Sequence, residues 1–303
     1  MIAISRTSGV DTWRQRRFDV ICAGEVLWSA TVGDTPTSPV TPGAPLGLRP
    51  GGGALNAAVA LSQRGLRVGL AAALGDDAHG RALVARVRAA GIDAGGVTLS
   101  SERANLVFVD AAGDAARVVP FRAEDEPPFA VPAGWAADVL LLSGLSPALA
   151  PAASRCKAAR AARRAGSLVV VDVNARRRAW AGYDPRAIQA VLREADVVRC
   201  STEDLAGLGI DEAKARAAMR PEATLVLTHG AGPARALGPF GEVVVSPREV
   251  RRQAAGGAGD VFTAALCAEL ARRGDPGSDR PSLWDRALRR GHEAALERLS
   301  AAR

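Results

Sequence analysis

Apolar runs of strand length alternate with helical patterns along most of this chain, and this alternation constrains the fold more than any other feature. The clearest run, Ser167–Val173, is a nearly continuous series of β-branched residues, as in strands that are buried on both faces of a parallel sheet. Strands that alternate with helices of about 10–15 residues form βαβ units. The sequence therefore predicts an α/β fold built on an open parallel sheet.

The predicted strands are short and apolar: Phe18–Ala23, Leu66–Ala73, Asp138–Ser143, Ser167–Val173, Asp196–Cys200 and Ala223–Thr228. The predicted helices carry apolar side chains at helical spacing: Ala54–Arg64, Ala78–Ala90, Pro151–Ala165, Pro185–Glu194, Asp211–Met219, Gly259–Arg272 and Leu283–Leu299. Two stretches break the alternation. Thr31–Pro50 is rich in Pro, Gly and Thr, and Asn105–Phe121 has the pattern of a hairpin that turns at Gly113. We expect both to form a small appendage on the main sheet.

The composition is that of a globular protein. The 303 residues are 48% hydrophobic and 23% charged, which excludes disorder over the whole chain, and no apolar run approaches the roughly 18–20 residues of a membrane span. The four cysteines, Cys22, Cys156, Cys200 and Cys267, form no C-x-x-C pair, so we expect free core thiols and a cytoplasmic location. Residues 1–17 lack a signal-peptide pattern and are interpreted as a disordered extension.

The positive charge of the chain raises the question of a nucleic-acid partner. Lys and Arg total 39 against 32 Asp and Glu, a net charge of +7, and basic proteins often bind nucleic acid. However, the arginines are scattered over many segments, and aromatic residues, on which single strands stack, are only 4%. We therefore predict solvated basic helix faces and no nucleic-acid or membrane partner. A small anionic substrate remains compatible with this charge.

The strongest chemical signal is the turn Gly256-Gly257-Ala258-Gly259-Asp260, which runs directly into an apolar helix. A glycine-rich turn at a helix N-terminus offers backbone N–H groups and the helix dipole to an anion. Such a cradle would stabilise the charge that develops on a transferring phosphoryl group. A carboxylate in the first helical turn can accept the proton of an attacking hydroxyl. The alternative is a flexible turn in which Asp260 only caps the helix.

Three weaker signals lie at predicted strand ends or helix starts. Glycines at 51–53 open a helix that carries Asn56, whose amide suits a hydroxyl-rich ligand. Asp172-Val173-Asn174-Ala175-Arg176 and Thr228-His229-Gly230-Ala231-Gly232-Pro233 follow predicted strands, and ligands of open α/β sheets bind outside the carboxyl ends of the strands. Taken singly, each segment is equally well explained as an ordinary loop or tight turn.

Together and in this order, the segments resemble the PfkB/ribokinase family of carbohydrate kinases. The resemblance extends from about Phe18 to Leu299 and is closest to the fructokinase and 2-keto-3-deoxygluconate kinase branch. The matching segments are Gly52-Gly53-Ala54-Leu55-Asn56, Gly75-Asp76-Asp77-Ala78-His79-Gly80, Asp172-x-Asn174-x-Arg176 with Trp180, the stretch from Ala195 to Leu205, and Gly257-Ala258-Gly259-Asp260. One such motif would be weak support, whereas five in sequence order are specific.

The resemblance implies a ribokinase-like fold: a doubly wound, mostly parallel sheet flanked by helices, with a small β lid. Residues 18–303 would form a single kinase domain, with lid segments at about 26–50 and 99–122. It also implies transfer of the γ-phosphoryl group of MgATP to a hydroxyl of a small sugar or sugar acid, of the fructose or 2-keto-3-deoxygluconate type. Relatives often dimerise through the lid, so a homodimer is a candidate assembly.

The resemblance further implies roles for individual residues. Asp260 would be the catalytic base, and the backbone of Gly257, Ala258 and Gly259 would form the anion hole. Residues expected to bind the sugar are Gly52, Gly53, Asn56, Arg122 and Asp260. Residues expected around the nucleotide are Asn174, Arg176, Ser201, Thr228, Gly230, Gly232, Gly257 and Gly259. Glu203 would act on Mg²⁺ through water, although it equally suits a plain acidic residue at a helix N-terminus.

Two departures from the family pattern bear on function. Ser29 stands where the family has an aspartate that holds sugar hydroxyls, and a serine can make only one weaker, neutral contact. The usual D-T-x before the anion hole is Ala254-Ala255-Gly256 here, which argues against a monovalent-cation site. Both motivate an alternative: a catalytically weakened protein of kinase fold that binds sugar or nucleotide as a sensor.

Overall fold

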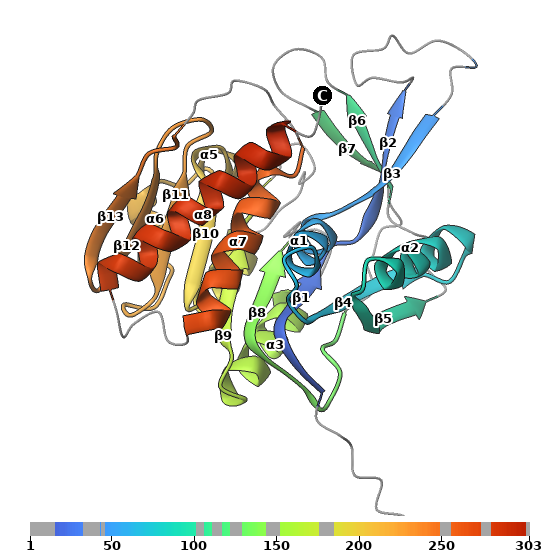
Figure 1. Cartoon of the computed structure of the whole chain (residues 1–303), viewed down its shortest axis with the longest axis horizontal. Coiled ribbons are helices and arrows are strands. Elements are labelled where there is room, and N and C mark those ends of the chain that lie inside the picture. The colour runs from blue at the N-terminus through green and yellow to red at the C-terminus, as the bar shows by residue number, and fades with distance from the viewer. Residues whose placement is uncertain are drawn as a thin grey trace, which may run out of the picture.

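A computed structural model describes residues 16–32, 43, 46–100, 106–110, 117–121, 129–143, 152–175, 185–248, 256–273 and 280–300. Two sheets organise these residues, a nine-stranded sheet and a separate four-stranded sheet (Figure 1). The strand order of the large sheet is β13-β12-β11-β10-β9-β8-β1-β4-β5. The fold class expected from the alternating pattern, an α/β fold with a mostly parallel sheet, is confirmed.

Seven neighbouring strands of the large sheet are parallel: β5 (Asp93–Ser100), β4 (Val68–Gly75), β1 (Arg16–Gly24), β8 (Trp135–Ser143), β9 (Leu168–Asp172), β10 (Val197–Ser201) and β11 (Thr224–Thr228). The antiparallel strands β12 (Ala234–Gly238) and β13 (Gly241–Val245) extend it at one edge. Consecutive strands therefore place their carboxyl ends along one rim of the sheet, which is where ligands of such folds bind.

Helices cover both faces of the large sheet. One core contains side chains of α1 (Gly53–Ser62), α2 (Ala78–Ala89), α7 (Ala258–Arg273) and α8 (Arg280–Ser300). The other contains side chains of α3 (Ala152–Arg164), α4 (Pro185–Leu192), α5 (Thr202–Leu208) and α6 (Glu212–Ala217). This arrangement is a doubly wound one.

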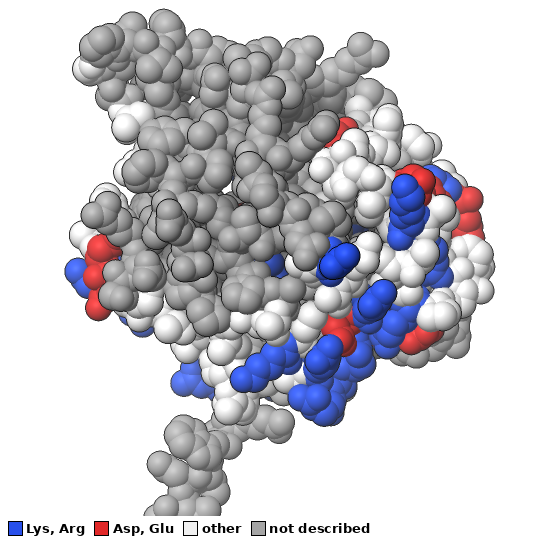
Figure 2. All heavy atoms as spheres, turned by 180° about the vertical axis from the view of Figure 1, so that it is seen from behind, with Lys and Arg blue, Asp and Glu red and all other residues white. Residues whose placement is uncertain are grey.

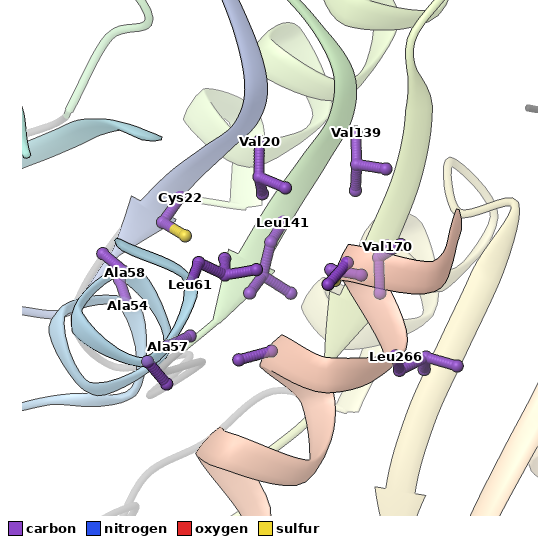
Figure 3. Close-up of a cluster of buried hydrophobic side chains, with 14 of the residues drawn as sticks. Val20, Cys22, Ala54, Ala57, Ala58, Leu61, Val139, Leu141, Val170 and Leu266 are labelled. Carbon is purple, nitrogen blue, oxygen red and sulfur yellow. The ribbon is translucent and has the colours of Figure 1, made fainter. Parts of the chain in front are cut away.

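Small side chains let α1 approach the sheet and α7 closely. Ala54, Ala57 and Ala58 are buried on α1, and Leu61 packs between this helix and the sheet (Figure 3). Because alanine adds little bulk, the axis of α1 can lie near the strands and near α7, which contacts α1 directly. The first turns of α1 and α7, which hold two predicted site motifs, are thereby brought together.

The four-stranded sheet stands beside the large one at the top of Figure 1. Its order is β3-β2-β6-β7, and it comprises β2 (Leu27–Val32), β3 (Leu46–Gly51), β6 (Leu106–Asp110) and β7 (Arg117–Phe121). β6 and β7 pair antiparallel, so the two strands predicted on either side of Gly113 are confirmed, while the turn itself lies outside the described residues. β3, β6 and β7 come from the two segments that interrupt the alternation, and β2 begins just before the first of them.

Several boundaries differ from the expectations. β1 begins at Arg16 rather than Phe18, because Arg16 and Arg17 pair with the start of β8 and form ion pairs with Asp93 and Asp138. The remaining residues of the expected disordered extension, 1–15, lie outside the described residues. Leu99 and Ser100, which were assigned to the lid, belong to β5 in the large sheet.

Four elements were not predicted: β5, β12, β13 and α5. β13 is exposed over much of its length, and β12 contains an arginine, two alanines and a glycine with only one large apolar residue, so both lack the apolar signal of the buried strands. The four cysteines are free and buried, as expected for core thiols. No helix among the described residues has the length and apolarity needed to cross a bilayer.

Basic side chains are spread over the face of the molecule seen in Figure 2, where Lys and Arg are more numerous than Asp and Glu. Several of the arginines on this chain are paired: Arg160 and Arg163 both contact Glu194, and Arg220 contacts Asp196. Isolated surface pairs of this kind contribute about 0–1 kcal/mol each. The absence of a nucleic-acid partner stays a prediction.

Gly291 provides a test of the packing between α7 and α8. A Cβ atom added at Gly291 would lie 2.6–2.7 Å from ring atoms of Phe262, so the ring occupies the space that a side chain would need. In an exposed helix interior, Gly→Ala stabilises by about 1 kcal/mol. Here we expect Gly291→Ala to lower the free energy of unfolding by about 1–2 kcal/mol, because overpacking outweighs helix propensity. Urea unfolding monitored by circular dichroism measures this change.

The matched control is Gly291→Ala combined with Phe262→Leu, which makes room for the added methyl group. The second substitution should recover part of the stability lost in the first, a positive coupling in a double-mutant cycle. An increase in stability on Gly291→Ala alone would show that the ring can move aside without cost.

Candidate active site

A row of polar side chains lies at the carboxyl ends of four adjacent strands, on the face covered by α7. The row consists of Ser143, Asp172, Arg199 and Thr228, all buried. Two residues earlier on the same strands, and therefore on the same face, are Leu141, Val170, Val197 and Val226, which belong to the core that includes α7. The packing thus changes from apolar to polar just beneath the N-terminal turn of α7.

Asp172 and Arg199 form the centre of this row. Arg199 Nη1 lies 3.2 Å from Asp172 Oδ1, and Arg199 Nη2 donates to Thr228 Oγ1 at 2.8 Å. Thr263 of α7 donates to Asp172 Oδ2 at 3.0 Å. Burial raises the pKa of Asp172, and the positive charge of Arg199 lowers it. Burial is the larger effect, so the pKa is about 6. Burial alone would lower the pKa of Arg199, but Asp172 and Asp204 together raise it.

The glycine-rich turn leads into α7 as its sequence predicts. Gly257 has a φ of 88°, a conformation that glycine adopts without strain, and its carbonyl accepts a hydrogen bond from Val261 N at 3.1 Å. Gly259 lies directly over Arg199: a Cβ atom there would be 3.0 Å from Arg199 Nη1. A side chain at 259 would therefore fit only if the guanidinium of Arg199 shifted by a few tenths of an ångström.

Asp260, in the first turn of α7, is the point at which three distant segments meet. Its Oδ2 accepts a hydrogen bond from Asn56 Nδ2 of α1 at 2.7 Å, and its Oδ1 accepts one from Asn174 Nδ2 at 3.3 Å. The residue is only 7% exposed. Two side-chain amides therefore orient the carboxylate from opposite oxygens, which suits a base that must hold one geometry. The structure brings together Asn56 and Asp260, which the sequence analysis assigned to the sugar, and Asn174, which it assigned to the nucleotide.

The loop that carries Asn174 is fixed by α5. Asn174 has a φ of 41°, a left-handed conformation that asparagine tolerates better than most residues. The next residue, Ala175, donates its N–H to Asp204 Oδ1 at 2.5 Å. Asp204 also closes a capping box with Ser201 at the N-terminus of α5. The buried Asp204 thus ties the β9 loop to α5 and holds Asn174 against Asp260.

The other residues predicted around the nucleotide lie on the loops after β10 and β11. The hydroxyl of Ser201 caps α5 and that of Thr228 accepts from Arg199, so both have protein partners. Gly230 is exposed with a φ of 45°, and Gly232 N donates to His229 O at 2.5 Å in a tight turn. Glu203 is exposed in the first turn of α5. No group of three His, Cys, Asp or Glu side chains that could hold a metal forms among the described residues.

The residues predicted to bind the sugar are only partly described. Gly52 precedes α1 with a φ of 102°, and a Cβ atom there would lie 2.4 Å from Glu25 O, so only glycine fits. Gly53 is the first, buried residue of α1. Ser29 lies on β2 with its Oγ close to Gly51. Arg122 and Arg176 lie outside the described residues.

A pocket of about 450 Å³ reaches Asn56 and Gly257 from the side of α1, α2 and α8. Arg86 and Arg298 line it, together with apolar residues of α1 and α2, whereas Asp260 does not. It adjoins the Asn56–Asp260 contact without containing the carboxylate.

Sequence reasoning missed the buried pair beneath α7. The motif Asp172-x-Asn174-x-Arg176 contained Asp172 and the stretch from Ala195 to Leu205 contained Arg199, but neither residue was assigned a role. The available signal was its position: Arg199 is a charged residue inside the apolar strand Val197–Ser201, where charge is rare unless it is paired.

Comparisons with known proteins identify the family of this chain. A sequence model described as pfkB family carbohydrate kinase matches residues 18–300. Fructokinase of Klebsiella pneumoniae is 32% identical over 250 residues, which cover 75% of this chain and 78% of that protein. The 5-dehydro-2-deoxygluconokinase of Shouchella clausii is 28% identical over 152 residues, 47% of each chain. The crystal structure of fructokinase with bound ATP from Xylella fastidiosa has a TM-score of 0.73 and 22% identity, covering 91% of this chain and 90% of that one.

The fold is ribokinase-like, and in it the Asp260 carboxylate stands at a glycine-rich helix N-terminus. The chain belongs to the pfkB family of carbohydrate kinases and is a sugar kinase. The resemblance stated on the five motifs is thereby confirmed at the level of family, fold and enzyme class.

The raised pKa of Asp172 predicts how stability changes with pH. Its pKa is about 6 in the folded chain and has an ordinary value of 3.8, so between these values the folded chain holds a proton that the unfolded chain releases. The unfolding free energy should therefore fall as pH rises from about 4 to about 6, by about 3 kcal/mol from this group. Asp172→Asn should lack this contribution. Urea unfolding across this pH range measures the difference between the two proteins, and parallel curves would contradict the assignment.

Proposed function

We propose that this protein transfers the γ-phosphoryl group of MgATP to a hydroxyl of a small sugar or sugar acid, of the fructose or 2-keto-3-deoxygluconate type. The observation that carries the proposal is the Asp260 carboxylate, held by Asn56 at 2.7 Å and by Asn174 at 3.3 Å at the N-terminus of α7. The names of the two relatives, a fructokinase and a 5-dehydro-2-deoxygluconokinase, support this substrate class.

In this proposal Asp260 is the general base. It accepts the proton of the attacking sugar hydroxyl, and the sugar oxygen forms a bond to the γ-phosphorus as the bond between that phosphorus and ADP breaks. The backbone N–H groups of Gly257, Ala258 and Gly259 face the charge on the transferring group. Because little covalent chemistry falls to the protein, the rate depends on positioning and on this electrostatic environment.

The remaining roles follow the family motifs. The sugar would be bound by Gly52, Gly53, Asn56 and Arg122. The nucleotide would be bound by residues at the strand ends, namely Asn174, Arg176, Ser201, Thr228, Gly230 and Gly232. Several of these side chains already have protein partners, so backbone atoms of the same loops would make part of the contacts.

Glu203 fits a magnesium ion held through water. It is exposed on the first turn of α5, beside the loops assigned to the nucleotide, and within the described part of the chain no cage of protein carboxylates surrounds it. Mg²⁺ keeps several waters and binds through one or two carboxylates plus substrate phosphates. When bound, the ion would neutralise phosphate charge during transfer.

A homodimer formed through the small sheet is part of the same proposal. Leu46 and Leu48 are 53% and 44% exposed on β3, which is an edge strand of this sheet. They lie on one face of the strand, and an unpaired apolar edge is a surface that proteins usually cover. A second copy of the chain would cover it.

The function is tested by a coupled assay of ADP release with MgATP over a panel of sugars, sugar acids and nucleosides. We expect turnover with fructose or 2-keto-3-deoxygluconate, at least tenfold above that with any nucleoside, a difference of about 1.4 kcal/mol in transition-state binding. Binding of sugar or nucleotide without ADP release from any acceptor would favour the sensor alternative motivated by Ser29 and 254–256.

The role of Asp260 is tested by Asp260→Asn. The amide keeps the size of the side chain but cannot accept the hydroxyl proton, so we expect kcat to fall by about 10²–10⁴ with nucleotide affinity unchanged within a few fold. Isothermal titration with ATP measures the affinity. Asp285→Asn, which alters an exposed carboxylate on α8, is the matched control. A near-normal rate for Asp260→Asn would rule out the base.

A further inference from the structure

Arg199 is a buried charge that lies between two strands and α7. It sits within β10 with its side chain 8% exposed, bonded to Asp172 of β9 and Thr228 of β11. Its guanidinium carbon lies 5.9 Å from the centroid of the Phe262 ring on α7. Val197, two residues earlier on β10, and Val226, the partner of Arg199 on β11, are apolar. An arginine here must therefore be explained by what its charge and its planar fork of donors do.

A contribution to stability does not explain why an arginine is buried at position 199. The Nε atom of Arg199 is buried and has no hydrogen-bond partner within the described part of the chain, although a buried donor without an acceptor is unfavourable. Buried ion pairs are often matched or exceeded in stability by apolar residues of similar volume. A cation beneath a helix N-terminus is also unfavourable for that helix, since the terminus carries partial positive charge.

The same position is favourable for an anion above the helix terminus. Two nitrogens of Arg199 lie 3.0 and 3.1 Å from where a Cβ of Gly259 would stand, so the positive end of the ion pair faces the first turn of α7. The negative end, Asp172 Oδ2, accepts from Thr263 one turn later, and Thr263 Oγ1 also lies 3.0 Å from Gly259 O. The ion pair and the helix dipole are thus oriented in the same direction. Both raise the electrostatic potential at the turn Gly257–Gly259.

We propose that Arg199 is a positioning residue for phosphoryl transfer: it fixes the first turn of α7 from below and adds positive potential to the Gly257–Gly259 turn. This role rests on the proposed function of that turn. Arg199 itself touches no substrate in this account. In a site with little water, a fixed charge acts more strongly than it would at the surface.

The test compares Arg199→Met, Arg199→Lys and the double variant Asp172→Asn/Arg199→Met with the wild type. With fructose and MgATP, Arg199→Met should lower kcat by about 10²-fold, the scale of a 1 Å misplacement, and change the KM for fructose less than threefold. Arg199→Lys keeps the charge but loses the fork, so it should retain about tenfold more activity than Arg199→Met. Arg235→Met, which alters an exposed, ion-paired arginine of β12, is the control and should leave kcat unchanged.

Two further readouts separate positioning from folding and from the proposed function. The double variant leaves no unpaired buried charge, so it should unfold at or above the wild-type temperature while its kcat stays about 10²-fold low. Amide hydrogen exchange of residues 257–263 should be faster in Arg199→Met than in Arg235→Met.

The outcomes are distinct. If the wild type releases no ADP from any acceptor but exchange at 257–263 still responds to Arg199, the proposed function fails while the structural placement of Arg199 is supported. A folded Arg199→Met protein with kcat within threefold of the wild type and unchanged exchange would overturn the proposal.

Discussion

The site depends on one interaction, the contact between the polar strand ends and the first turn of α7. At this level of the sheet the side chains that face α7 include an ion pair, Asp172–Arg199, in place of apolar residues. On the helix side, Thr263 bonds to Asp172 and Gly259 lies against Arg199. Two residues after Asp172, Asn174 meets Asp260. The same strand end therefore supports α7 from below and orients the Asp260 carboxylate from the side, so the position of this carboxylate is fixed by the sheet itself.

A second requirement is the close approach of α1 to α7. Asn56 can reach Asp260 only because α1 presents Ala54, Ala57 and Ala58 to its surroundings. Gly24 likewise allows a close approach, here between the carboxyl ends of β1 and β8. A Cβ atom at Gly24 would lie 2.0 Å from Ser143 O. Small residues in separate segments thus set the spacing of the site, while the polar residues that they position carry its chemistry.

The sequence allows six of the seven parallel strands, the paired strands within 106–121 and the turn at 256–260 to be predicted, because each is a local pattern of periodicity or turn chemistry. The convergence of Asn56 and Asn174 on Asp260 could not be predicted, since it joins residues up to 204 positions apart. Arg199 shows the same limit: its role depends on which strand lies beside β9 and which helix lies above. β12 and β13 were missed because β12 has few large apolar residues and β13 is largely exposed.

These contacts also bear on one of the two departures in the sequence. Ser29 lies on β2 in the small sheet, whereas Asp260 is held by Asn56 and Asn174 and the Asp172–Arg199 pair lies beneath α7. The support of the Asp260 carboxylate therefore does not depend on residue 29. Under the proposed function, a serine at 29 would change the contacts available to the acceptor without changing how the proposed base is held, so a change in acceptor preference is compatible with phosphoryl transfer at Asp260.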